Sequence, residues 1–421
     1  MGKRVVIVGG GVIGLATAYY CRRRGWRVTV VDRGPERRDG CSFQNAGMLV
    51  TSHFVPLAAP GMVALGLKWM WNPASPFYVK PRLSWDLLDW GVKFWRAATK
   101  EHVGRAAPLL RDLSRASHRC FEELAALPGS DFGLVRKGLL MLCRTPHALE
   151  EEIRTAELGR SLGIAAEALD ATQVAALDPG IRMDVAGAVY FPQDCHLTPD
   201  RFVSQLQDRL AAEGTEFAWN TEVTGWRVET GRHIRAVATR DGGEIEADEF
   251  VLCGGAWSPL LARELDLRLP MQAGKGYSLT LAKPRRLPEV CAILTEARVA
   301  VTPMGGALRF AGTMEIAGLN EDINPVRVRG IIAAAAKYYP EFEPSDFDGV
   351  VPWRGLRPCS PDGMPYVGRT AKFANLAIAA GHAMMGLSLG PVTGKLIAEV
   401  LAGETPQLDM AQLSPDRYAG R

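Results

Sequence analysis

The chain has 421 residues, of which 47% are hydrophobic and 23% are charged, values typical of a globular protein with a large core. Its 49 basic and 46 acidic residues leave a net charge of +3, which gives no reason to expect a nucleic-acid partner. The eight cysteines form no C-x-x-C pair and no cluster with zinc-site spacing, so we expect reduced packing residues and no metal centre.

The first predicted elements lie within residues 3–33. Residues 5–8 are a β-branched apolar run, typical of a strand buried on both faces. Gly9, Gly11 and Gly14 follow as G-x-G-x-x-G. This spacing permits a tight turn, close approach of a pyrophosphate and close packing of a helix on the strand.

A helix is predicted for residues 12–24, with its N-terminal N–H groups facing the phosphates. Residues 28–31 predict a second strand, and Asp32 at its end can accept hydrogen bonds from ribose hydroxyls. The unit predicts a dinucleotide site. Because NAD and FAD both use it, it leaves the cofactor open.

Residues 55–95 are unusually rich in tryptophan. One interpretation is a pair of helices that caps an apolar pocket, with the tryptophans in the core. The other is a patch that contacts a membrane or a quinone-reducing partner. The five tryptophans are Trp69, Trp71, Trp85, Trp90 and Trp95.

The remaining chain alternates between helical and strand patterns. The last predicted elements are a strand, a glycine-rich turn at residues 381–386 and a final helix. The other predicted helices span 105–128, 146–163 and 325–339, and strands are predicted within 132–144, 215–253 and 276–320.

Several stretches together resemble the FAD-dependent D-amino-acid oxidase/dehydrogenase family, to which glycine oxidase and sarcosine oxidase also belong. NAGM and GKGYSLT (274–280) are most similar to D-amino-acid dehydrogenases. The final helix would then point its positive end at the flavin, where it stabilises the anionic reduced form. The stretches are the opening fingerprint, SFQNAGM (42–48), ADEFVLCGGAWS (247–258), WRGLRPCSPDGMPYVG (353–368) and AAGHAMMGLSLGPVTGKLIAEVLAG (379–403).

The resemblance implies FAD as the cofactor. It assigns the pyrophosphate to the glycine-rich turn, the adenosine to residues after the second strand, and the flavin to the 42–48 stretch and the final turn. The family often has a glutamate where this chain has Asp32, whose side chain is one methylene shorter. The implied cofactor residues are Gly9, Gly11, Val12, Ile13, Gly14, Asp32, Arg33, Ser42, Asn45, Gly47, Met48, Val223, Gly254, Trp257, Gly381, Met385, Gly386, Leu387 and Ser388.

By the same resemblance, Arg357 forms a two-point salt bridge with the substrate carboxylate, a task suited to a planar guanidinium. Arg354 and Arg309 are weaker candidates. Tyr277 either donates its hydroxyl to the carboxylate or packs in a strand. His382 either contacts flavin or substrate or satisfies the turn backbone.

Met384 stands where glycine oxidase has an arginine, which argues against a glycine-specific pocket. The implied reaction is oxidative deamination of D-amino acids by hydride transfer from Cα to FAD N5, with the electrons passed to a quinone or another acceptor. One alternative is a D-proline or D-hydroxyproline dehydrogenase, or a sarcosine- or glycine-type amine oxidase. Another is a flavin-bearing electron-transfer subunit of a larger complex.

We expect an α/β protein in which a Rossmann-like FAD-binding domain is interleaved with a mixed-sheet α+β substrate domain. Residues 1–55, 195–262 and 350–421 would form the first domain, and residues 56–194 and 263–349 the second. No signal peptide precedes the first strand and no apolar run approaches the roughly 20 residues that span a bilayer. We therefore expect a cytoplasmic location, with peripheral contact at the inner face of the membrane as the alternative for residues 55–95.

Overall fold

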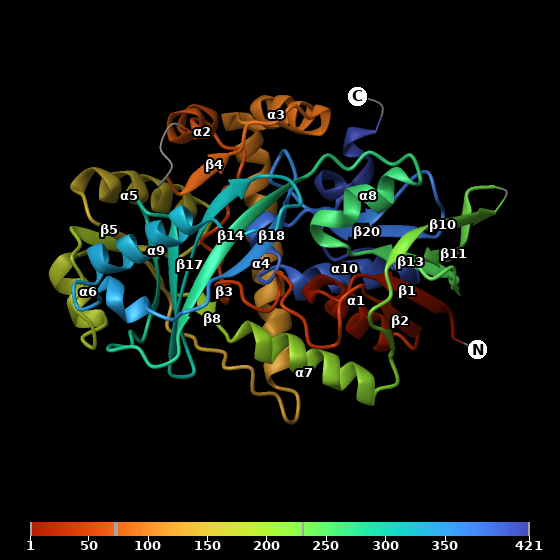
Figure 1. The fold of residues 1–421 in the computed structure, drawn as a ribbon, viewed down its shortest axis with the longest axis horizontal. Coiled ribbons are helices and arrows are strands. Elements are labelled where there is room, and N and C mark those ends of the chain that lie inside the picture. Colours follow the sequence, from red (N-terminus) through yellow and green to blue (C-terminus); the bar gives the residue numbers. More distant parts are fainter. Residues whose placement is uncertain (1, 71–74, 230, 420–421) are drawn as a thin grey trace.

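The computed structural model describes residues 2–70, 75–229 and 231–419. Two large sheets lie side by side in Figure 1, and the first of them contains both strands predicted within residues 3–33. Trp71 and residues 72–74 of the tryptophan-rich segment lie outside the described residues.

The first sheet has six strands in the order β19-β20-β13-β1-β2-β9. All neighbours are parallel except β19, which is antiparallel to β20. The central strands are continuous apolar runs because both faces of the sheet are covered. The strands are β1 (Arg4–Val8), β2 (Arg27–Val31), β9 (Glu216–Ala218), β13 (Glu249–Leu252), β19 (Tyr366–Arg369) and β20 (Leu376–Ala380).

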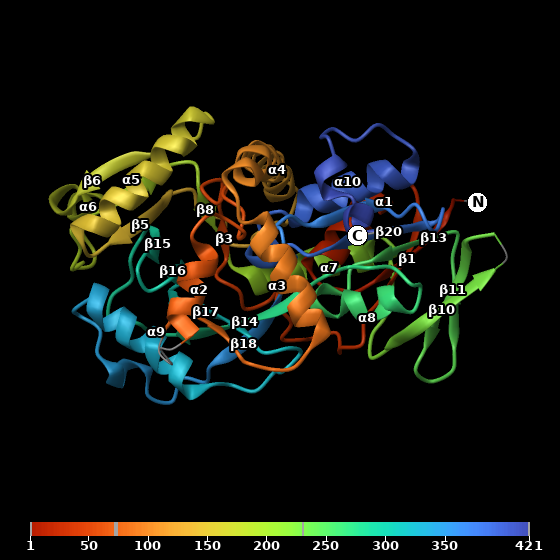
Figure 2. The ribbon, with the colours of Figure 1, turned by 90° about the horizontal axis from the view of Figure 1, so that it is seen from above.

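Helices cover one face of this sheet and a small three-stranded sheet covers the other, as Figure 2 shows from above. The helices are α1 (Val12–Arg22), α4 (Lys100–Ala125), α7 (Pro199–Ala212) and α10 (Gly390–Ala402). The opposite face carries β10 (Val223–Glu229), β11 (His233–Thr239), β12 (Glu244–Glu246) and α8 (Ser258–Arg263).

The second sheet is mixed, in the order β18-β14-β17-β16-β15-β5-β7-β6, with β4 paired to β17. The β15–β5 and β17–β4 pairs are parallel and the others antiparallel. Its strands are β4 (Phe77–Val79), β5 (Leu139–Cys143), β6 (Glu167–Asp170), β7 (Gly187–Phe191), β14 (Gln272–Leu281), β15 (Cys291–Leu294), β16 (Val299–Met304), β17 (Ala307–Ile316) and β18 (Trp353–Cys359).

Different elements cover the two faces of the second sheet. Helix α9 (Pro325–Tyr338) packs on one face, while α5 (Pro146–Ser161) and residues 48–54 pack on the other. The remaining elements are α2 (Met62–Met70), α3 (Trp85–Ala97), α6 (Ala171–Leu177), the paired strands β3 (Met48–Leu49) and β8 (Cys195–His196), and short 3-10 turns that include η1 (Gly255–Trp257), η3 (Ala383–Met385) and η5 (Pro415–Tyr418).

The expected fold class is confirmed, and the largest differences in bounds concern two predicted elements. The helix predicted for 105–128 begins at Lys100 because Thr99 caps it, its Oγ1 accepting from the His102 backbone N–H at 3.1 Å. The strands predicted within 132–144 reduce to β5. Gly133 and Gly138 have φ values of 66° and 72°, so the chain turns there instead of continuing extended.

The division into domains stays a proposal. All six strands of the first sheet fall within residues 1–55, 195–262 and 350–421. However, β18 also falls within 350–421, and it pairs with β14 in the second sheet. The segment after residue 350 therefore contributes strands to both sheets.

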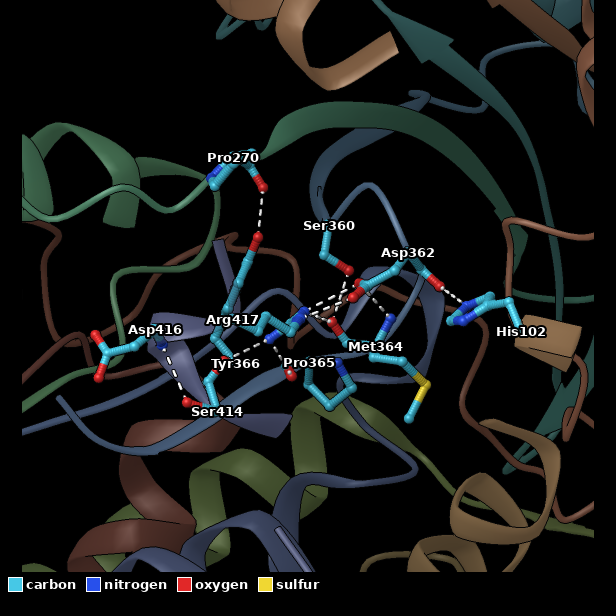
Figure 3. A network of polar contacts seen from close by, with 10 residues as sticks. All are labelled: His102, Pro270, Ser360, Asp362, Met364, Pro365, Tyr366, Ser414, Asp416 and Arg417. Atoms are coloured by element: carbon cyan, nitrogen blue, oxygen red, sulfur yellow. Dashed lines mark hydrogen bonds and ion pairs between the residues drawn. The ribbon is translucent and has the colours of Figure 1, made fainter. Parts of the chain in front are cut away.

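A polar network fixes the loop that follows β18 (Figure 3). Arg417 of η5 donates to both carboxylate oxygens of Asp362, at 2.7 and 3.0 Å, and to the Met364 carbonyl at 2.6 Å. The Arg417 guanidinium also lies 3.8 Å from the ring centre of Tyr366. The Asp362 carbonyl in turn contacts Nε2 of His102 on α4 at 2.7 Å. The network ties the exit of β18 to the helical side of the first sheet.

Candidate active site

A cavity of about 1920 Å³ is bounded by residues of both large sheets. It is lined by every residue that the resemblance assigned to cofactor or substrate except Gly14, Gly381 and the weaker candidate Arg309. These two glycines are packed instead. A Cβ on Gly14 would overlap the Gly9 carbonyl, and one on Gly381 would lie 2.8 Å from the Tyr366 ring.

The glycine-rich turn leaves room for a ligand at the N-terminus of α1. Gly9 has φ 114°, and a Cβ there would overlap the Cys253 carbonyl, so the turn requires glycine. The N-cap residue of α1 is Gly11, which has no side chain to accept a hydrogen bond from the first turn of the helix. Ser42 Oγ accepts the first N–H, that of Val12, at 2.9 Å.

Asp32 holds the turn from its other side. Its two carboxylate oxygens accept from the backbone N–H groups of Gly10 and Gly34, each at 2.7 Å. A carboxylate has about four lone-pair directions. Asp32 therefore keeps acceptor capacity for ribose hydroxyls at the end of β2.

Two arginine–tryptophan stacks flank this end of the cavity. The Arg33 guanidinium lies 3.9 Å from the ring centre of Trp257, and that of Arg38 lies 4.1 Å from Trp219. Arg38 also donates to the Gly10 carbonyl. Sequence reasoning found Arg33 and Trp257 but missed Arg38 and Trp219. These two residues are far apart in the sequence, so no local pattern links them.

The 42–48 loop is bound to the second sheet by side chains from three strands. Within the loop, Asn45 Oδ1 accepts from the Gly47 N–H at 2.8 Å. The loop therefore has a fixed position between the two sheets. The three contacts to loop carbonyls are Ser278 Oγ to Gln44 at 3.1 Å, Arg309 Nη1 to Asn45 at 2.9 Å and Thr302 Oγ1 to Ala46 at 2.7 Å.

The final turn closes the cavity. Ser388 Oγ donates to the Met48 carbonyl at 2.9 Å, which joins the turn before α10 to the 42–48 loop. Gly386 and Leu387 line the cavity just before α10 begins at Gly390. Met384 in η3 also lines the cavity and is half exposed. The glycine cradle, the acid after β2 and the cavity between the sheets fit an FAD molecule.

Arg357 lies in the cavity wall on β18. Its Nη1 donates to the Thr313 carbonyl at 2.8 Å, and it forms no ion pair with any acidic side chain among the described residues. A Cβ on Gly276 of β14 would overlap its guanidinium, so the arginine lies flat across the neighbouring strand. Its remaining N–H groups are available to an anion.

Arg354 and Arg309, the other candidates for binding the substrate carboxylate, form hydrogen bonds within the protein. Arg354 donates to Asp39 at 2.6 Å and to the Glu321 carbonyl at 3.2 Å. Arg309 is buried and binds the Asn45 carbonyl and Thr280 Oγ1. These contacts make both of them structural.

Tyr277 contributes to the cavity wall, but its side chain packs away from Gly276 in the core beneath α9. Its hydroxyl donates to Glu315 Oε2 at 2.8 Å and accepts from the Asn324 N–H at 3.3 Å. Burial, reinforced by Glu315, raises the pKa of Tyr277. Because residues along a strand alternate between faces, Gly276 and Tyr277 cannot both face the substrate.

His382 is buried at the final turn, where its Nε2 lies 2.9 Å from Thr393 Oγ1 on α10. Burial lowers the pKa of His382 to about 3, so the ring is neutral. Cys41 lines the cavity beside Gly355. Burial raises the pKa of this thiol to about 11, although Arg357 opposes the shift.

Two functional candidates were missed by sequence reasoning. Thr313 contacts Arg357 and lines the cavity, yet the sequence predicts only strands within the 276–320 stretch that contains it. Gly276 lies in the GKGYSLT stretch (274–280), but the resemblance assigns no role to it. Neither has a local signal, because both depend on pairing between strands distant in sequence.

Comparison with known proteins agrees with this geometry. The family model described as "FAD dependent oxidoreductase" matches residues 4–400. The D-amino acid dehydrogenase of Paramagnetospirillum magneticum is 32% identical over 422 residues, covering 99% of each chain. That of Methylobacterium nodulans is 33% identical over 420 residues, with the same coverage.

Solved structures share the fold. Glycine oxidase from Geobacillus kaustophilus has a TM-score of 0.78 at 24% identity, covering 99% of this chain and 100% of that chain. L-Proline dehydrogenase from P. horikoshii has a TM-score of 0.75 at 18% identity, covering 99% and 98%. The match of the family model over almost the whole chain, and of full-length relatives, establishes that this chain belongs to the FAD dependent oxidoreductase family.

Proposed function

We propose that this FAD-dependent enzyme oxidises D-amino acids to imino acids, which water hydrolyses to keto acids and ammonia. The observation that carries the proposal is Arg357, a cation in the cavity wall whose guanidinium is paired with a backbone carbonyl. An amino-acid carboxylate is the anion that fits it. The relatives named D-amino acid dehydrogenase support the choice of D-amino acids over other amines.

In this proposal, Arg357 binds the substrate carboxylate through N–H groups that Thr313 does not use, and so fixes the orientation of Cα. FAD, when bound, supplies the acceptor for the hydride that leaves Cα. The 42–48 loop holds the distance between cofactor and anchor, because Ser278 and Thr302 bind it to the sheet that carries Arg357.

Proton transfer from the substrate ammonium does not require His382. A general base is most effective when its pKa lies near the working pH. Burial lowers the pKa of His382 to about 3, and its Nε2 contacts Thr393, so we assign it a role in shaping the final turn. We assign Tyr277 to support of β14, since its hydroxyl is bound to Glu315.

The geometry supports the cofactor roles implied by the resemblance. We propose that the glycine-rich turn holds the pyrophosphate, that Asp32 and the Arg33–Trp257 stack hold the adenosine side, and that residues 42–48 and 385–388 lie against the flavin. Their place along the cavity wall supports these roles.

For the electron acceptor we propose a quinone at a membrane surface. Helix α3 lies on the outside of the molecule (Figures 1 and 2), and Trp85 and Trp95 near its ends are 87% and 64% exposed. Leu88 and Val92 continue the same stripe at three- and four-residue spacing and are also exposed. Such a stripe suits a helix lying in a membrane interface.

None of the helices in the described residues is both long and apolar enough to cross a bilayer. The attachment that we propose through α3 is peripheral, at the cytoplasmic face. Trp90, in contrast, is buried and donates its Nε1–H to the Cys359 carbonyl at 2.9 Å. Among the tryptophans of this segment whose side chains are described, Trp90 packs in the core, and the exposed Trp85 and Trp95 support the proposed membrane contact.

The test is anaerobic mixing of the FAD-loaded full chain with D- and L-amino acids, D-proline, D-hydroxyproline, glycine and sarcosine, with flavin bleaching as the readout. Bleaching by D-amino acids that Arg357→Ala abolishes and Arg357→Lys weakens is the expected result. Bleaching by prolines alone, or by sarcosine or glycine, would establish the corresponding alternative. A fully loaded protein that none of these substrates bleaches would leave the electron-transfer subunit as the remaining interpretation.

A further inference from the structure

Thr313 has an unusual backbone conformation next to the carboxylate anchor. Its φ is 65°, in the left-handed region that L-residues rarely adopt. The other non-glycine residues with positive φ in the described ranges are Asn220, Arg232, Asp266, Arg298 and Ala383, and none of these is β-branched. Outliers of this kind persist where the surrounding structure enforces them, often at functional sites.

A β-bulge enforces the conformation. In the antiparallel pair of β14 and β17, Lys275 is opposite Glu315 but Tyr277 is opposite Gly312. The two residues Thr313 and Met314 are therefore opposite the single residue Gly276. The extra residue turns the Thr313 carbonyl out of the strand pairing and toward Arg357 Nη1, 2.8 Å away.

Gly276 completes the arrangement on the other strand. Since any side chain there would overlap the guanidinium, the residue opposite the bulge leaves space for Arg357 to lie across the sheet. Thr313, Gly276 and Arg357 come from three adjacent strands, and all three line the cavity. The bulge and the glycine together define the direction in which the arginine points.

The hydroxyl of Thr313 is not used by the fold. Its Oγ1 is buried and has no hydrogen-bond partner in the part of the chain that the structure describes. The residue as a whole is half-buried, because it forms part of the cavity wall. Buried hydroxyls are normally paired, so the unpaired hydroxyl of this cavity-lining residue, whose carbonyl holds Arg357, is available to a ligand group.

We propose that Thr313 is a substrate-binding residue: its carbonyl orients Arg357 and its hydroxyl donates to the same substrate carboxylate. This inference rests on the proposed function, because it assumes an amino-acid carboxylate at Arg357. In this arrangement the Thr313 carbonyl accepts a hydrogen bond from Arg357, and the Thr313 hydroxyl donates one to the substrate carboxylate. Thr313 thus sets how tightly and in which orientation a carboxylate is held.

Three variants separate the two roles, all tested as FAD-loaded full chain. Thr313→Val keeps the β-branch and removes the hydroxyl. Thr313→Ser keeps the hydroxyl. Thr313→Gly removes the hydroxyl but suits the positive φ and keeps the carbonyl. Thr155→Val is the matched control, because Thr155 lines the cavity from α5 and bonds only the Glu151 carbonyl in the described ranges.

The first measurement is the Kd of benzoate, a carboxylate with no amine, with benzamide as its neutral counterpart. We expect Thr313→Val and Thr313→Gly to weaken benzoate binding by about 10-fold or more, as for loss of a hydrogen bond to a charged group, with little change for benzamide. Thr313→Ser and Thr155→Val should stay within about 3-fold of wild type. Thr313→Gly should also raise the thermal midpoint, because glycine relieves the backbone strain.

Steady-state kinetics on D-amino acids should show the same loss mainly in KM. If valine and glycine variants bind benzoate as wild type does, the hydroxyl has no such role and the proposal is overturned. The proposal is equally overturned if Thr313→Ser weakens benzoate binding as much as Thr313→Val does. Failure of the proposed function looks different: no D-amino acid would bleach the flavin, while benzoate binding would still report on Arg357 and Thr313.

Discussion

Arg417 and Asp362 form a two-point ion pair, at 2.7 and 3.0 Å, in which each side chain is only 12% exposed. The pair binds η5 to the loop that follows β18. This strand ends at Cys359, shortly after the anchor Arg357. Burial alone would raise the pKa of Asp362, but Arg417 outweighs burial and the pKa is lowered. The pair therefore stabilises the folded chain while the carboxylate is ionised.

The first prediction concerns this pair. Arg417→Ala and Asp362→Ala should each lower the free energy of unfolding by about 3–5 kcal/mol, since each leaves its partner buried and unpaired. Urea denaturation of the FAD-loaded protein measures the loss. Arg136→Ala, which removes an exposed pair with Glu122, is the control and should cost less than about 1 kcal/mol. Equal losses in the exposed and buried pairs would contradict the prediction.

The second prediction concerns pH. Burial lowers the pKa of His382 from 6.5 to about 3, so unfolding lets the ring bind a proton that the folded protein excludes. Stability should therefore fall as the pH drops from about 6.5 toward 3, by at most about 1.4 kcal/mol per pH unit from this residue. His382→Gln, which keeps a polar group near Thr393, should show a shallower fall.

Thermal midpoints measured between pH 7.5 and 5 compare the two proteins. His53 and His196, whose pKa values are also lowered by burial to about 4, contribute to the acid loss in both, so the difference between the curves is the relevant quantity. Parallel curves for wild type and His382→Gln would show that His382 does not titrate on unfolding.

A third prediction tests the space beneath the anchor. Gly276→Ala places a methyl where the Arg357 guanidinium lies and should raise KM for amino acids by about 10- to 100-fold, because a misplaced anchor loses its charge-assisted hydrogen bonds. FAD affinity should not change. Gly225→Ala on β10 is the control, since nothing lies within 4 Å of a Cβ there. An unchanged KM in Gly276→Ala would mean that Arg357 does not bind substrate in this orientation.

The fourth prediction addresses the cofactor. Asp32→Ala should raise the Kd for FAD by about 10- to 100-fold, because it removes acceptors for both the ribose and the turn backbone. Asp32→Glu should recover part of the affinity, since glutamate offers the same carboxylate with a longer reach. Titration of the FAD-free protein, followed by quenching of flavin fluorescence, gives both constants. Wild-type affinity in Asp32→Ala would exclude the ribose contact.

The fifth prediction concerns α3. Replacing Trp85 and Trp95 by serine should abolish co-sedimentation with vesicles of phosphatidylglycerol and phosphatidylcholine, while bleaching by the substrate in solution stays intact. Val228→Ser serves as control, because Val228 is an exposed apolar residue on β10 away from this helix. Vesicle binding that survives the double replacement would assign any membrane contact to another surface.

Local patterns were sufficient for the glycine-rich turn and Asp32 of the cofactor side, but not for the Arg38–Trp219 stack. The run from β1 through Gly9, Gly11 and Gly14 to Asp32 is contiguous, so spacing alone predicts the strand, turn, helix and acid that the structure contains. The final turn before α10 was predictable for the same reason.

The substrate half depends on pairing between distant strands. Arg357 was found through the resemblance of its motif, whereas Thr313 becomes visible only once β14, β17 and β18 are aligned. The bulge at Thr313 arises from a shift in the register between β14 and β17. The sequence around Thr313 carries no signal of this shift, because it depends on how β17 pairs with β14. Tyr277 shows the converse: its motif left a substrate contact and packing in a strand as alternatives, and in the structure its hydroxyl donates to Glu315.

The hydrogen bonds from Ser278, Arg309 and Thr302 to the 44–46 carbonyls have a consequence for how the protein assembles. The loop carbonyls are bound by side chains of the second sheet, and Ser278 and Thr302 find their acceptors in the loop, so each part stabilises the other. We therefore expect the flavin-side wall and the substrate-side sheet to unfold together. Binding of FAD should then stabilise both halves of the molecule by mass action, including the half that never touches the adenosine.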